Sequence, residues 1–400
     1  MKILIVTQYF WPEEFRVNDL AIDLVKRGNT VTVLTGNPNY PKGKFFKGYS
    51  FKFMTENYQG IKIYRVPIIP RGKNSLTLLL NYLSFAIMGS IFSLFHTIKY
   101  DKVFAINFSP ITAVYPAIIY KKRHKTQLYL WVQDLWPESV SAAGNIKSRF
   151  VLNLLTKMVK YIYKNSDRVL LQSEAFTSSV EAKGVAKKQI RYLPNWAEDL
   201  YSDKSIISIG KYVNIIPKGF IVMFAGNIGE AQDFDAILKA AVITKQFTDI
   251  KWVIVGDGRK KTWVETEIIR LGLQETFFLL GRYPMNEIPS FFVCADVMLL
   301  TLKNEDIFSL TIPAKVQSYM AFGRPIIGML NGIGSNLIID ADCGYVGMAG
   351  NHFSLAENVI KAYKEESNVL LNMGINGTKY YNQNFSKTIV IDRLMGIFHE

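Results

Sequence analysis

The chain has 400 residues, of which 49% are hydrophobic and 13% aromatic, and this suits two domains of roughly 200 residues better than one core. Its net charge of +14 lies in residues 1–195, which hold 28 lysines and arginines against 11 aspartates and glutamates; the remainder holds 19 against 22. Two cysteines and a short apolar run at the N-terminus exclude a disulfide-rich secreted protein. We expect a cytoplasmic protein whose basic half meets nucleic acid or an acidic membrane surface.

Short apolar runs alternate with helical patterns along both halves, which predicts an α/β fold with parallel sheets. The predicted strands of the first half are KILIVT, TVTVLTG, IKIYRVP, KVFAIN, QLYLWVQ and RVLLQS, with a helix in RVNDLAIDLVKRGN that ends at Gly28. Those of the second half are FIVMFAGN, KWVIVGDG, TFFLLG, VMLLTL and PIIGML, with helices in DFDAILKAAVIT and IPAKVQSYMAFG. The pattern breaks at 196–218, where we expect a linker. The predicted domains are 1–200 and 201–380, followed by a helix at 381–400 that packs back toward the first domain.

One stretch, Leu76–Ile98, contains no charged residue and is long enough to span a bilayer. Polar residues interrupt it, and the alternation requires a helix on the sheet at this position. A helix that covers the sheet or lies on a membrane surface is therefore favoured over a span. The stretches 42–53 and 147–164 combine basic residues with aromatic residues or leucines, which suits anionic lipid headgroups. A solvated basic face would have the same composition.

Several features of the second half indicate a phosphate site. The strand FIVMFAGN leads to Gly226, Asn227 and Gly229, and KWVIVGDG to Gly256 and Gly258, where backbone N–H groups could approach a ligand. Either pair could also be an ordinary turn, and neither completes the dinucleotide motif G-x-G-x-x-G. Pro313 suits the first position of a helix, so its positive end and Lys315 form a predicted pyrophosphate site with the N–H groups of Ser309, Leu310 and Thr311.

In the first half, WVQDLWPE places Gln133, Asp134 and Glu138 after a predicted strand, where ligands of open α/β sheets bind. A capped turn beside a surface charge would have the same sequence pattern. No histidine lies in a motif, which disfavours a histidine base. The stretches DFD (233–235) and DAD (340–342) imitate a metal motif, but one begins a helix and the other precedes a turn, so no metal site is predicted.

The order of AGNIGE, VGDG, LLGRYP, CADVMLL, NED, YMAFGRPII and DADCGYV resembles the C-terminal half of the family 4 glycosyltransferases. The first half agrees through YFWPEEFRVNDLAIDLVKRGNTVTVLT, WVQDLW, LLQSEA and YLPN. The family has GT-B architecture, in which two Rossmann-like parallel-sheet domains face a cleft. With QDLWPES, the chain is most similar to bacterial polysaccharide enzymes, in particular the WbuB-like transferases of N-acetyl-L-fucosamine in O-antigen synthesis.

This resemblance implies a retaining, metal-independent transferase without a cofactor. It would move N-acetyl-L-fucosamine from a UDP-sugar onto an undecaprenyl-diphosphate-linked N-acetylglucosamine at the inner face of the plasma membrane. The departing diphosphate itself would take the acceptor proton, while the protein supplies positioning and electrostatics. Nucleic acid is not expected as a partner, because the basic residues form no recognised reader motif. A nucleotide-sugar 2-epimerase and a catalytically silent nucleotide-sugar-binding subunit remain alternatives.

Family roles transfer only where residues match. Glu305 matches the first of two family glutamates, which faces the donor sugar, whereas Ser318 replaces the second and leaves ribose contact to Gln317 or Ser318. Asn227 replaces a family arginine that holds the pyrophosphate, and Gln232 or Asp233 replaces a lysine. Arg282, Lys315 and the helix terminus are the expected substitutes.

On the first domain, Gln133 replaces a family histidine that reaches the 6-hydroxyl of the donor, which fits a 6-deoxy sugar. Glu305, Asp134 and Lys315 are the candidate catalytic residues. The expected acceptor-binding residues are Glu13, Glu14, Arg16, Asn18 and Glu138.

Overall fold

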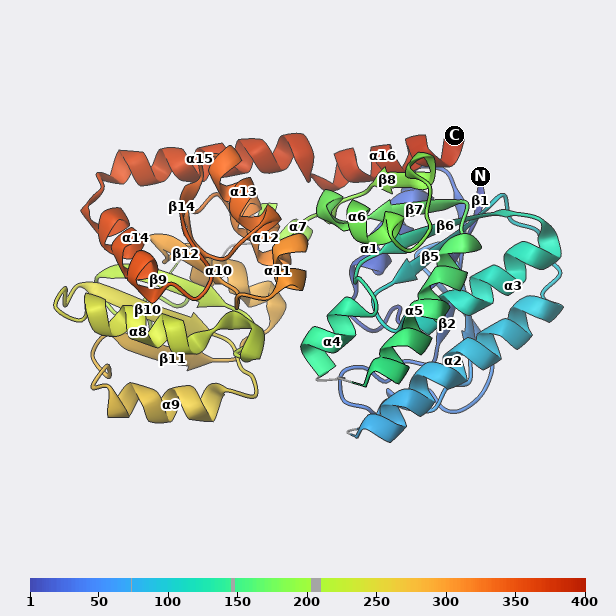
Figure 1. Ribbon diagram of the computed structural model, residues 1–400, viewed down its shortest axis with the longest axis horizontal. Coiled ribbons are helices and arrows are strands. Elements are labelled where there is room, and N and C mark those ends of the chain that lie inside the picture. Colours follow the sequence, from blue (N-terminus) through green and yellow to red (C-terminus); the bar gives the residue numbers. More distant parts are fainter. Residues whose placement is uncertain (73, 145–147, 203–209) are drawn as a thin grey trace. The chain divides into compact units, whose positions relative to one another are not determined.

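The computed structural model describes residues 1–72, 74–144, 148–202 and 210–400 (Figure 1). The chain forms two compact units, Met1–Pro194 together with Ile391–Glu400, and Asn195–Val390. Each unit has its own largely parallel sheet, as the α/β prediction requires. The first boundary falls at Pro194 rather than at residue 200, and the second falls at Val390 rather than at residue 380.

The first unit contains an eight-stranded sheet in the order β3-β4-β2-β1-β5-β6-β7-β8, in which only β3 and β4 pair antiparallel. Six predicted strands are confirmed: β1 (Lys2–Val6), β2 (Thr30–Gly36), β4 (Ile61–Val66), β5 (Lys102–Asn107), β6 (Gln127–Val132) and β7 (Arg168–Leu171). The apolar pattern does not reveal β3 (Met54–Tyr58) or β8 (Ile190–Tyr192). The first is a polar edge strand, and the second has only three residues.

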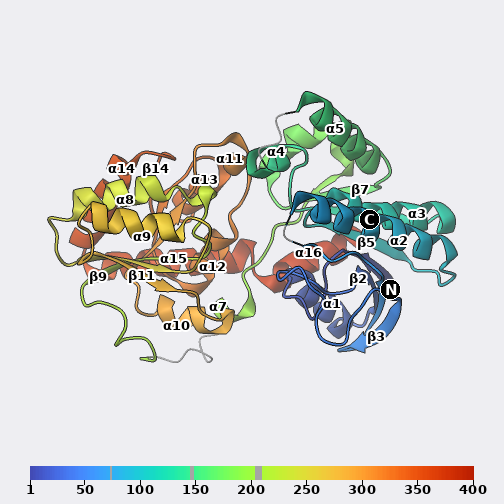
Figure 2. The same cartoon turned by 90° about the horizontal axis from the view of Figure 1, so that it is seen from below.

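Helices cover this sheet. They are α1 (Arg16–Lys26), α2 (Ser75–Phe95), α3 (Tyr115–His124), α4 (Glu138–Gly144), α5 (Arg149–Lys164) and α6 (Thr177–Glu181), with 3-10 turns at Ile111–Val114, Glu174–Phe176 and Lys187–Gln189. The predicted first helix is confirmed: α1 buries Val17, Leu20 and Leu24, and the chain turns at Gly28 with a φ of 81°. Helix α2 lies beside α3 (Figure 2), where a Cβ on Gly89 would come within 2.7 Å of the Pro116 ring.

The second unit contains a parallel six-stranded sheet in the order β11-β10-β9-β12-β13-β14. The five predicted strands are confirmed: β9 (Phe220–Ala225), β10 (Ile250–Val255), β11 (Phe277–Gly281), β12 (Val297–Thr301) and β13 (Ile326–Met329). The sixth strand, β14 (Gly344–Gly347), escapes prediction because glycines stand at both ends of it. Gly344 is required by packing, since a Cβ there would lie 1.8 Å from the Ile326 carbonyl oxygen.

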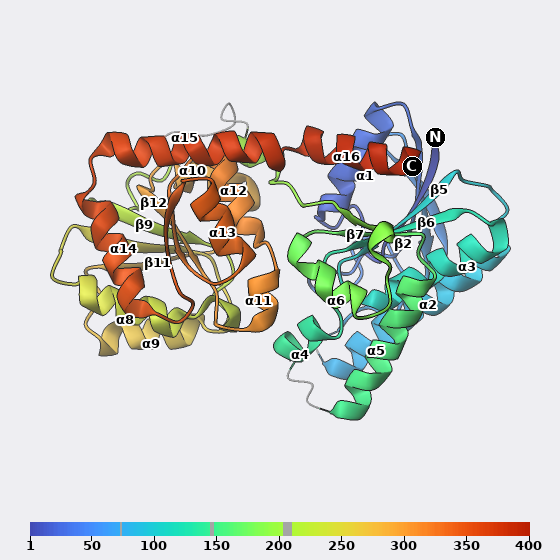
Figure 3. The same cartoon turned by 45° about the horizontal axis from the view of Figure 1, so that its top comes forward.

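Two helical layers sandwich this sheet. One core joins β9, β10 and β12 to α8 (Phe234–Thr244), α9 (Lys261–Arg270) and α14 (His352–Lys364). The opposite core joins the sheet to α10 (Ile288–Phe292), α12 (Ala314–Phe322), α13 (Ile333–Asp340) and the long α15 (Ser367–Asn384), which runs along α12 (Figure 3). The remaining elements are α7 (Asp199–Ser202), α11 (Asp306–Leu310) and α16 (Lys387–His399), with 3-10 turns at Glu230–Gln232 and Met285–Glu287. Helices α8 and α12 confirm the two predicted ones.

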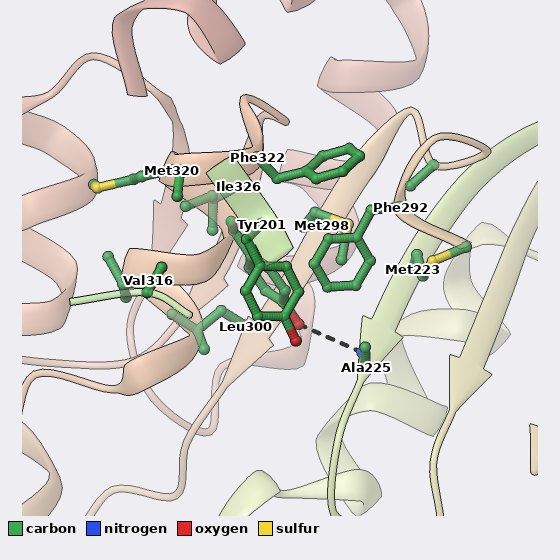
Figure 4. Close-up of a cluster of buried hydrophobic side chains, with 14 of the residues drawn as sticks. Tyr201, Met223, Ala225, Phe292, Met298, Leu300, Val316, Met320, Phe322 and Ile326 are labelled. Atoms are coloured by element: carbon green, nitrogen blue, oxygen red, sulfur yellow. Dashed lines mark hydrogen bonds between the residues drawn. The ribbon is translucent and has the colours of Figure 1, made fainter. Parts of the chain in front are cut away.

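The expected linker is wrong for the part of 196–218 that the structure describes, and residues 203–209 lie outside that part. Ala197, Tyr201, Tyr212 and Ile216 belong to the core of the second unit. Figure 4 shows Tyr201 among the side chains that α12 packs against the sheet. The segment is domain structure because its apolar residues are buried, although they are too sparse to form a periodic pattern.

The predicted C-terminal helix is two helices, α15 and α16, and the unit boundary falls inside α16. Residues 391–400 pack on the first unit, where the Phe398 ring meets Phe104 and Tyr129 edge-on at 5.6 and 4.9 Å. Glu400 forms an ion pair with Arg191 at 2.5 Å. The predicted return to the first domain thus begins at Ile391 rather than at residue 381.

Candidate functional site

In the second unit, the predicted donor residues follow the carboxyl ends of parallel strands, which meet at one edge of the sheet. A Cβ on Gly256 would lie 1.8 Å from the Gly226 carbonyl oxygen, and one on Gly258 would lie 2.2 Å from that of Ile228. These glycines therefore allow the loops after β9 and β10 to pack backbone against backbone. The ordinary-turn alternative accounts for this glycine pair without a ligand.

Gly226 is different, because the space beside it is filled by Lys315 of α12. A Cβ on Gly226 would lie 2.7 Å from Lys315 Cε and 2.8 Å from Nζ, and Nζ stands 3.4 Å from the centre of the Phe224 ring. No residue that the structure describes forms an ion pair or a hydrogen bond with this ammonium group. Burial lowers the pKa of Lys315 to about 7. An anion bound at the end of β9 would supply the missing countercharge and restore the charged lysine.

Hydrogen bonds connect the base of this site to the sheet and close the first turn of α12. The backbone N–H of Ala225 donates a hydrogen bond of 3.4 Å to the Tyr319 hydroxyl, one turn along α12 from Lys315 (Figure 4). Pro313 is the N-cap residue of α12 rather than its first residue, since its ψ of 130° is extended and the helix begins at Ala314. The Pro313 carbonyl accepts the N–H of Val316 at 3.0 Å. Lys315 thus stands in the first turn, at the positive end of the helix.

The predicted contacts just before α12 are largely engaged within α11. Ser309 Oγ donates to the Asp306 carbonyl at 2.7 Å, and Thr311 Oγ1 donates to that of Ile307 at 2.9 Å. Their backbone N–H groups donate to the carbonyls of Glu305 and Phe308, and Leu310 is the last residue of α11. A role for these three residues in binding phosphate stays a prediction.

Gln317 and Ser318, the proposed ribose contacts, also bond within the unit. Gln317 is fully buried and its Nε2 donates to the Asn195 carbonyl at 2.7 Å, whereas Ser318 Oγ donates back to the Ala314 carbonyl at 3.2 Å. Gln317 therefore ties α12 to the start of the second unit. Their contact with a ribose stays a prediction.

The other candidates at this edge are exposed. Glu305 is the N-cap residue of α11, Arg282 directly follows β11, and Asn227 packs its amide beside Gly229. Arg282 stands two strands away from β9 in the sheet order, whereas Lys315 touches the end of β9. Lys315 therefore adjoins the loop after β9, whereas Arg282 adjoins the loop after β10, since it follows Gly281, whose carbonyl accepts the Gly256 N–H at 2.8 Å.

In the first unit, Gln133 and Asp134 follow β6, as predicted. Gln133 is buried, and its backbone N–H donates a hydrogen bond to the Asn107 carbonyl at 3.2 Å. The Asp134 carbonyl accepts a hydrogen bond from Asn107 Nδ2 at 3.4 Å. The Asp134 carboxylate has no hydrogen bond from the described residues. Burial raises its pKa to about 6. A carboxylate in this state can accept or orient a hydroxyl proton near neutral pH.

Glu13 lies inside the domain. Its Oε1 accepts hydrogen bonds from the backbone N–H groups of Asn39 and Tyr40 at 2.8 and 2.7 Å. Burial raises the pKa of Glu13 to about 7, against the opposing effect of these two hydrogen bonds. Glu13 holds the loop after β2, and its direct contact with an acceptor stays a prediction.

The other predicted acceptor residues are spread along the unit. Asn18 closes the loop before α1, since its Oδ1 accepts from Trp11 N at 2.9 Å and its Nδ2 donates to the Glu13 carbonyl at 2.7 Å. Glu14 is exposed, and Arg16 is the first residue of α1. Glu138 forms an ion pair with Lys183 at 2.5 Å. Burial alone would raise the pKa of Glu138, but the hydrogen bond from Lys183 holds it below its usual range.

The structure adds a group that the sequence did not single out, which we call the arginine–tyrosine cluster: Tyr9, Tyr40, Arg71 and Tyr82. The Tyr9 and Tyr40 rings lie 5.6 Å apart, and the Arg71 guanidinium lies 5.3 Å from the centre of the Tyr40 ring. Burial raises the pKa of Tyr82, the charge of Arg71 opposes this, and Asp134 adds to it. Tyr82 is therefore subject to the charges of both Arg71 and Asp134. In the sequence, its only trace is a basic residue in a Pro-Arg-Gly turn.

The surface of α2 is also unusual, because its leucines face outward. Helix α2 is the one helix in the described residues that is long and apolar enough to cross a membrane, yet only 28% of its apolar window is buried. Its buried face combines Phe85, Ala86 and Gly89 with the polar Asn81 and Ser93. Asn81 Oδ1 accepts from Gln8 Nε2 at 2.7 Å, and Asn81 Nδ2 donates to the Ile69 carbonyl at 2.6 Å. The outward residues form the apolar face of α2, namely Leu76, Leu79, Leu80, Leu83, Ile87, Ile91, Leu94 and Phe95.

Two basic segments accompany it. Phe51 and Phe53 are exposed in the loop 42–53 together with its four lysines. Helix α5 exposes Phe150 and Leu154, and its Tyr161 ring stacks on Tyr115 of α3 with the ring centres 6.1 Å apart. Residue 147, the first of the predicted basic stretch, lies outside the described residues.

Comparison with known proteins identifies both halves. Residues 210–380 match the family described as "Glycosyl transferases group 1", and residues 14–196 match "Glycosyl transferase 4-like domain". The chain is 25% identical over 337 residues to the putative colanic acid biosynthesis glycosyl transferase WcaI of Escherichia coli K12, which covers 81% of this chain and 82% of that protein. It is 28% identical over 213 residues, half of each chain, to the probable glycosyltransferase WbjE of Pseudomonas aeruginosa.

Solved structures share the fold over the whole chain. Anabaena Alr3699/HepE in complex with UDP and glucose has a TM-score of 0.69 at 16% identity, with 100% of both chains covered. A UDP-forming α,α-trehalose-phosphate synthase from Burkholderia vietnamiensis has a TM-score of 0.76 at 10% identity, covering 100% of this chain and 96% of the other. The fold is therefore that of the GT-B glycosyltransferases, as the sequence predicts.

Proposed function

The chain is a glycosyltransferase with a group 1 domain and a 4-like domain, and on this premise we propose that it moves a sugar from UDP onto a polyprenyl-diphosphate-linked saccharide. The transfer is metal-independent and retains the anomeric configuration. Relatives named for colanic acid biosynthesis and teichuronic acid biosynthesis support a place in the assembly of bacterial surface polysaccharide.

The observation that carries the donor half is Lys315. Its ammonium group stands beside Gly226 in the first turn of α12, partly buried and without a counterion in the described residues. A diphosphate fits this position because it supplies negative charge to the lysine and to the helix terminus together. Structures of the same fold contain UDP, UDP-glucose or UDP-2-fluoro glucose, which supports UDP as the carrier.

During transfer, the bond between the anomeric carbon and the diphosphate oxygen breaks, and a bond forms from that carbon to the acceptor hydroxyl oxygen. The hydroxyl proton passes to the departing diphosphate. Lys315 and the α12 terminus stabilise the charge that develops on that diphosphate. Glu305 orients the donor sugar, and Asp134 orients the acceptor hydroxyl.

The proposed donor sugar is N-acetyl-L-fucosamine, a 6-deoxy sugar, and the proposed acceptor is undecaprenyl-diphosphate-linked N-acetylglucosamine. Support comes from Gln133, which is buried at the end of β6 and replaces the histidine that reaches a 6-hydroxyl in related enzymes. A Gln133→His variant should shift preference toward 6-hydroxy donors. An unchanged ratio of kcat/KM for the two donor classes would show that this position does not read carbon 6.

The enzyme is proposed to act as a peripheral protein on the inner face of the plasma membrane. The polar residues of α2 are fixed to the domain through Asn81, and its leucines are exposed, which suits a helix lying on a membrane rather than one crossing it. The lysines of loop 42–53 add attraction to anionic headgroups.

A donor screen with a synthetic N-acetylglucosaminyl diphosphate lipid tests this function, with UDP release as the readout. Release that requires both the 6-deoxy donor and the lipid supports the proposal. An epimerase would convert the donor without any lipid. A silent binding subunit would bind UDP-sugars and release no UDP with any pair, and either result would refute the transferase.

A further inference from the structure

We propose that Arg71 binds the diphosphate of the lipid-linked acceptor; this rests on the proposed function. Arg71 directly precedes Gly72, at the turn that leads into α2. Its guanidinium lies 5.3 Å from the centre of the Tyr40 ring. None of the carboxylates that the structure describes lies within ion-pair distance of it.

A nearby arginine shows what a structural arginine looks like in this domain. Arg65 is almost completely buried, forms an ion pair with Glu56, and donates to the carbonyls of Gly36 and Trp11. Each of its three guanidinium nitrogens donates to the protein. Arg71 is instead partly exposed, and stacking on Tyr40 leaves its donor edge available to a ligand. A guanidinium fork matches the oxygens of a diphosphate.

Buried contacts determine where Arg71 stands. Glu13 Oε1 accepts the N–H of Tyr40 at 2.7 Å, which fixes the ring on which Arg71 stacks. The same oxygen accepts the N–H of Asn39 at 2.8 Å, and Asn39 Oδ1 in turn accepts the backbone N–H of Arg71 at 2.8 Å. Glu13 therefore positions both partners of the cation–π pair. Its effect on the acceptor is indirect.

The surroundings of Arg71 match the two chemical parts of a polyprenyl diphosphate. On one side, the charge of Arg71 acts on Tyr82, which is also within reach of the charge of Asp134. On the other side, Thr77 in the first turn of α2 contacts Gly72, since a Cβ added to Gly72 would lie 2.2 Å from Thr77 Oγ1. The apolar face of α2 begins at Leu76, so a hydrocarbon chain can leave the Arg71 site along exposed leucines.

Positive charge is also concentrated here. Gly43 of loop 42–53 packs on this turn, since a Cβ on it would lie 3.0 Å from the Gly72 carbonyl oxygen. The exposed Lys42 and Lys44 flank that glycine. The electrostatic potential around Arg71 therefore favours an anion with more than one charge.

The test measures binding of farnesyl diphosphate, farnesol and inorganic pyrophosphate to the full chain in detergent, without any donor. We expect Arg71→Gln to weaken farnesyl diphosphate binding by about 10-fold or more, because charge-assisted hydrogen bonds are lost. The affinities for farnesol and UDP should not change. Arg71→Lys should lose less affinity for farnesyl diphosphate than Arg71→Gln does. Lys188→Gln, which removes an exposed charge from the same domain, should have no effect.

Equal affinity of Arg71→Gln and the unaltered protein for farnesyl diphosphate would refute the site, and equal loss for farnesol would assign Arg71 to the fold instead. Pyrophosphate that binds as tightly as farnesyl diphosphate would refute a lipid ligand. If Arg71→Gln does not fold, Arg71→Lys carries the comparison. Because these assays need no sugar transfer, a failed donor screen with intact Arg71-dependent binding would sink the proposed function alone.

Discussion

Glu13 of the first domain and Lys315 of the second are ionisable groups whose pKa values burial shifts, and they differ in sign and in partners. Glu13 of the first domain receives two backbone hydrogen bonds, whereas Lys315 of the second lies beside Gly226 and the face of Phe224, with no ion pair or hydrogen bond from the residues that the structure describes. Burial brings the pKa of both to about 7, from opposite directions. Glu13 bonds to the backbone of its own domain through Oε1 and so supports the fold, whereas the described residues offer Lys315 no hydrogen-bond acceptor, which makes Lys315 the candidate for a ligand.

The strongest way to break this comparison is to replace Lys315. Lys315→Met keeps the side chain that fills the space at Gly226 but removes the charge, so kcat should fall by about 10²–10³-fold while the fold is retained. Initial rates of UDP release measure this. Lys239→Met, on the exposed surface of α8, should act like the unaltered enzyme. Activity of Lys315→Met within a few-fold of that control would remove the phosphate role.

The second prediction concerns the fold. Glu13→Ala leaves two buried N–H groups without an acceptor, and we expect the free energy of unfolding to fall by about 2–4 kcal/mol. Chemical denaturation monitored by circular dichroism provides the measurement. The neighbouring Glu14 is exposed, so Glu14→Ala should change stability by less than about 0.5 kcal/mol. Similar losses for both variants would mean that Glu13 does not anchor the loop after β2.

A third comparison contrasts the surfaces of the domains. Leu79→Ser with Leu83→Ser removes two side chains that are 51% and 41% exposed on α2, and binding to anionic vesicles should weaken by about 10-fold or more. Co-sedimentation at low salt gives the affinity. Ile269→Ser on α9 removes an exposed side chain from the second domain and should leave binding unchanged. Equal binding of all variants would contradict the attachment through α2.

The smallest effects are opposite slopes of stability against pH. Between about pH 7 and pH 10.5, Lys315 is neutral in the folded chain and protonated in the unfolded chain. The contribution of Lys315 to the free energy of unfolding therefore rises with pH over this range. Glu13 keeps its proton in the fold above pH 4.5, so its contribution falls as pH rises toward about 7. Denaturation midpoints of Lys315→Met and Glu13→Gln, each compared with the unaltered protein, isolate the two slopes. Parallel curves would show that neither group titrates differently on folding.

The regular parts of both sheets could be predicted because their strands are continuous apolar runs, as in FIVMFAGN and KVFAIN. The pattern failed at β3, β8 and β14, which are stabilised by pairing with a neighbouring strand. Strand β3 is polar, β8 has only three residues, and β14 has a glycine at each end. It also mistook 196–218 for a linker, because burial of Tyr201 and Tyr212 depends on distant residues such as Phe292 and Phe291.

The candidate site divides in the same way. Lys315 could be named from the sequence because a proline, a lysine and a helix start are local features, and Asp134 because it follows a strand. Arg71 could not, since its relation to Tyr40, Glu13 and Asp134 crosses four separate segments of the chain.

By itself, then, the sequence determined the α/β class, the two-domain GT-B architecture and the glycosyltransferase family, because strand periodicity and motif order are written along the chain. Only the tertiary structure decided which charges are satisfied. It gave Glu13 two backbone partners, left Lys315 beside a ring, and turned the leucines of α2 outward. The physical reason is that burial and hydrogen bonding are properties of neighbours in space, which the order of residues does not display.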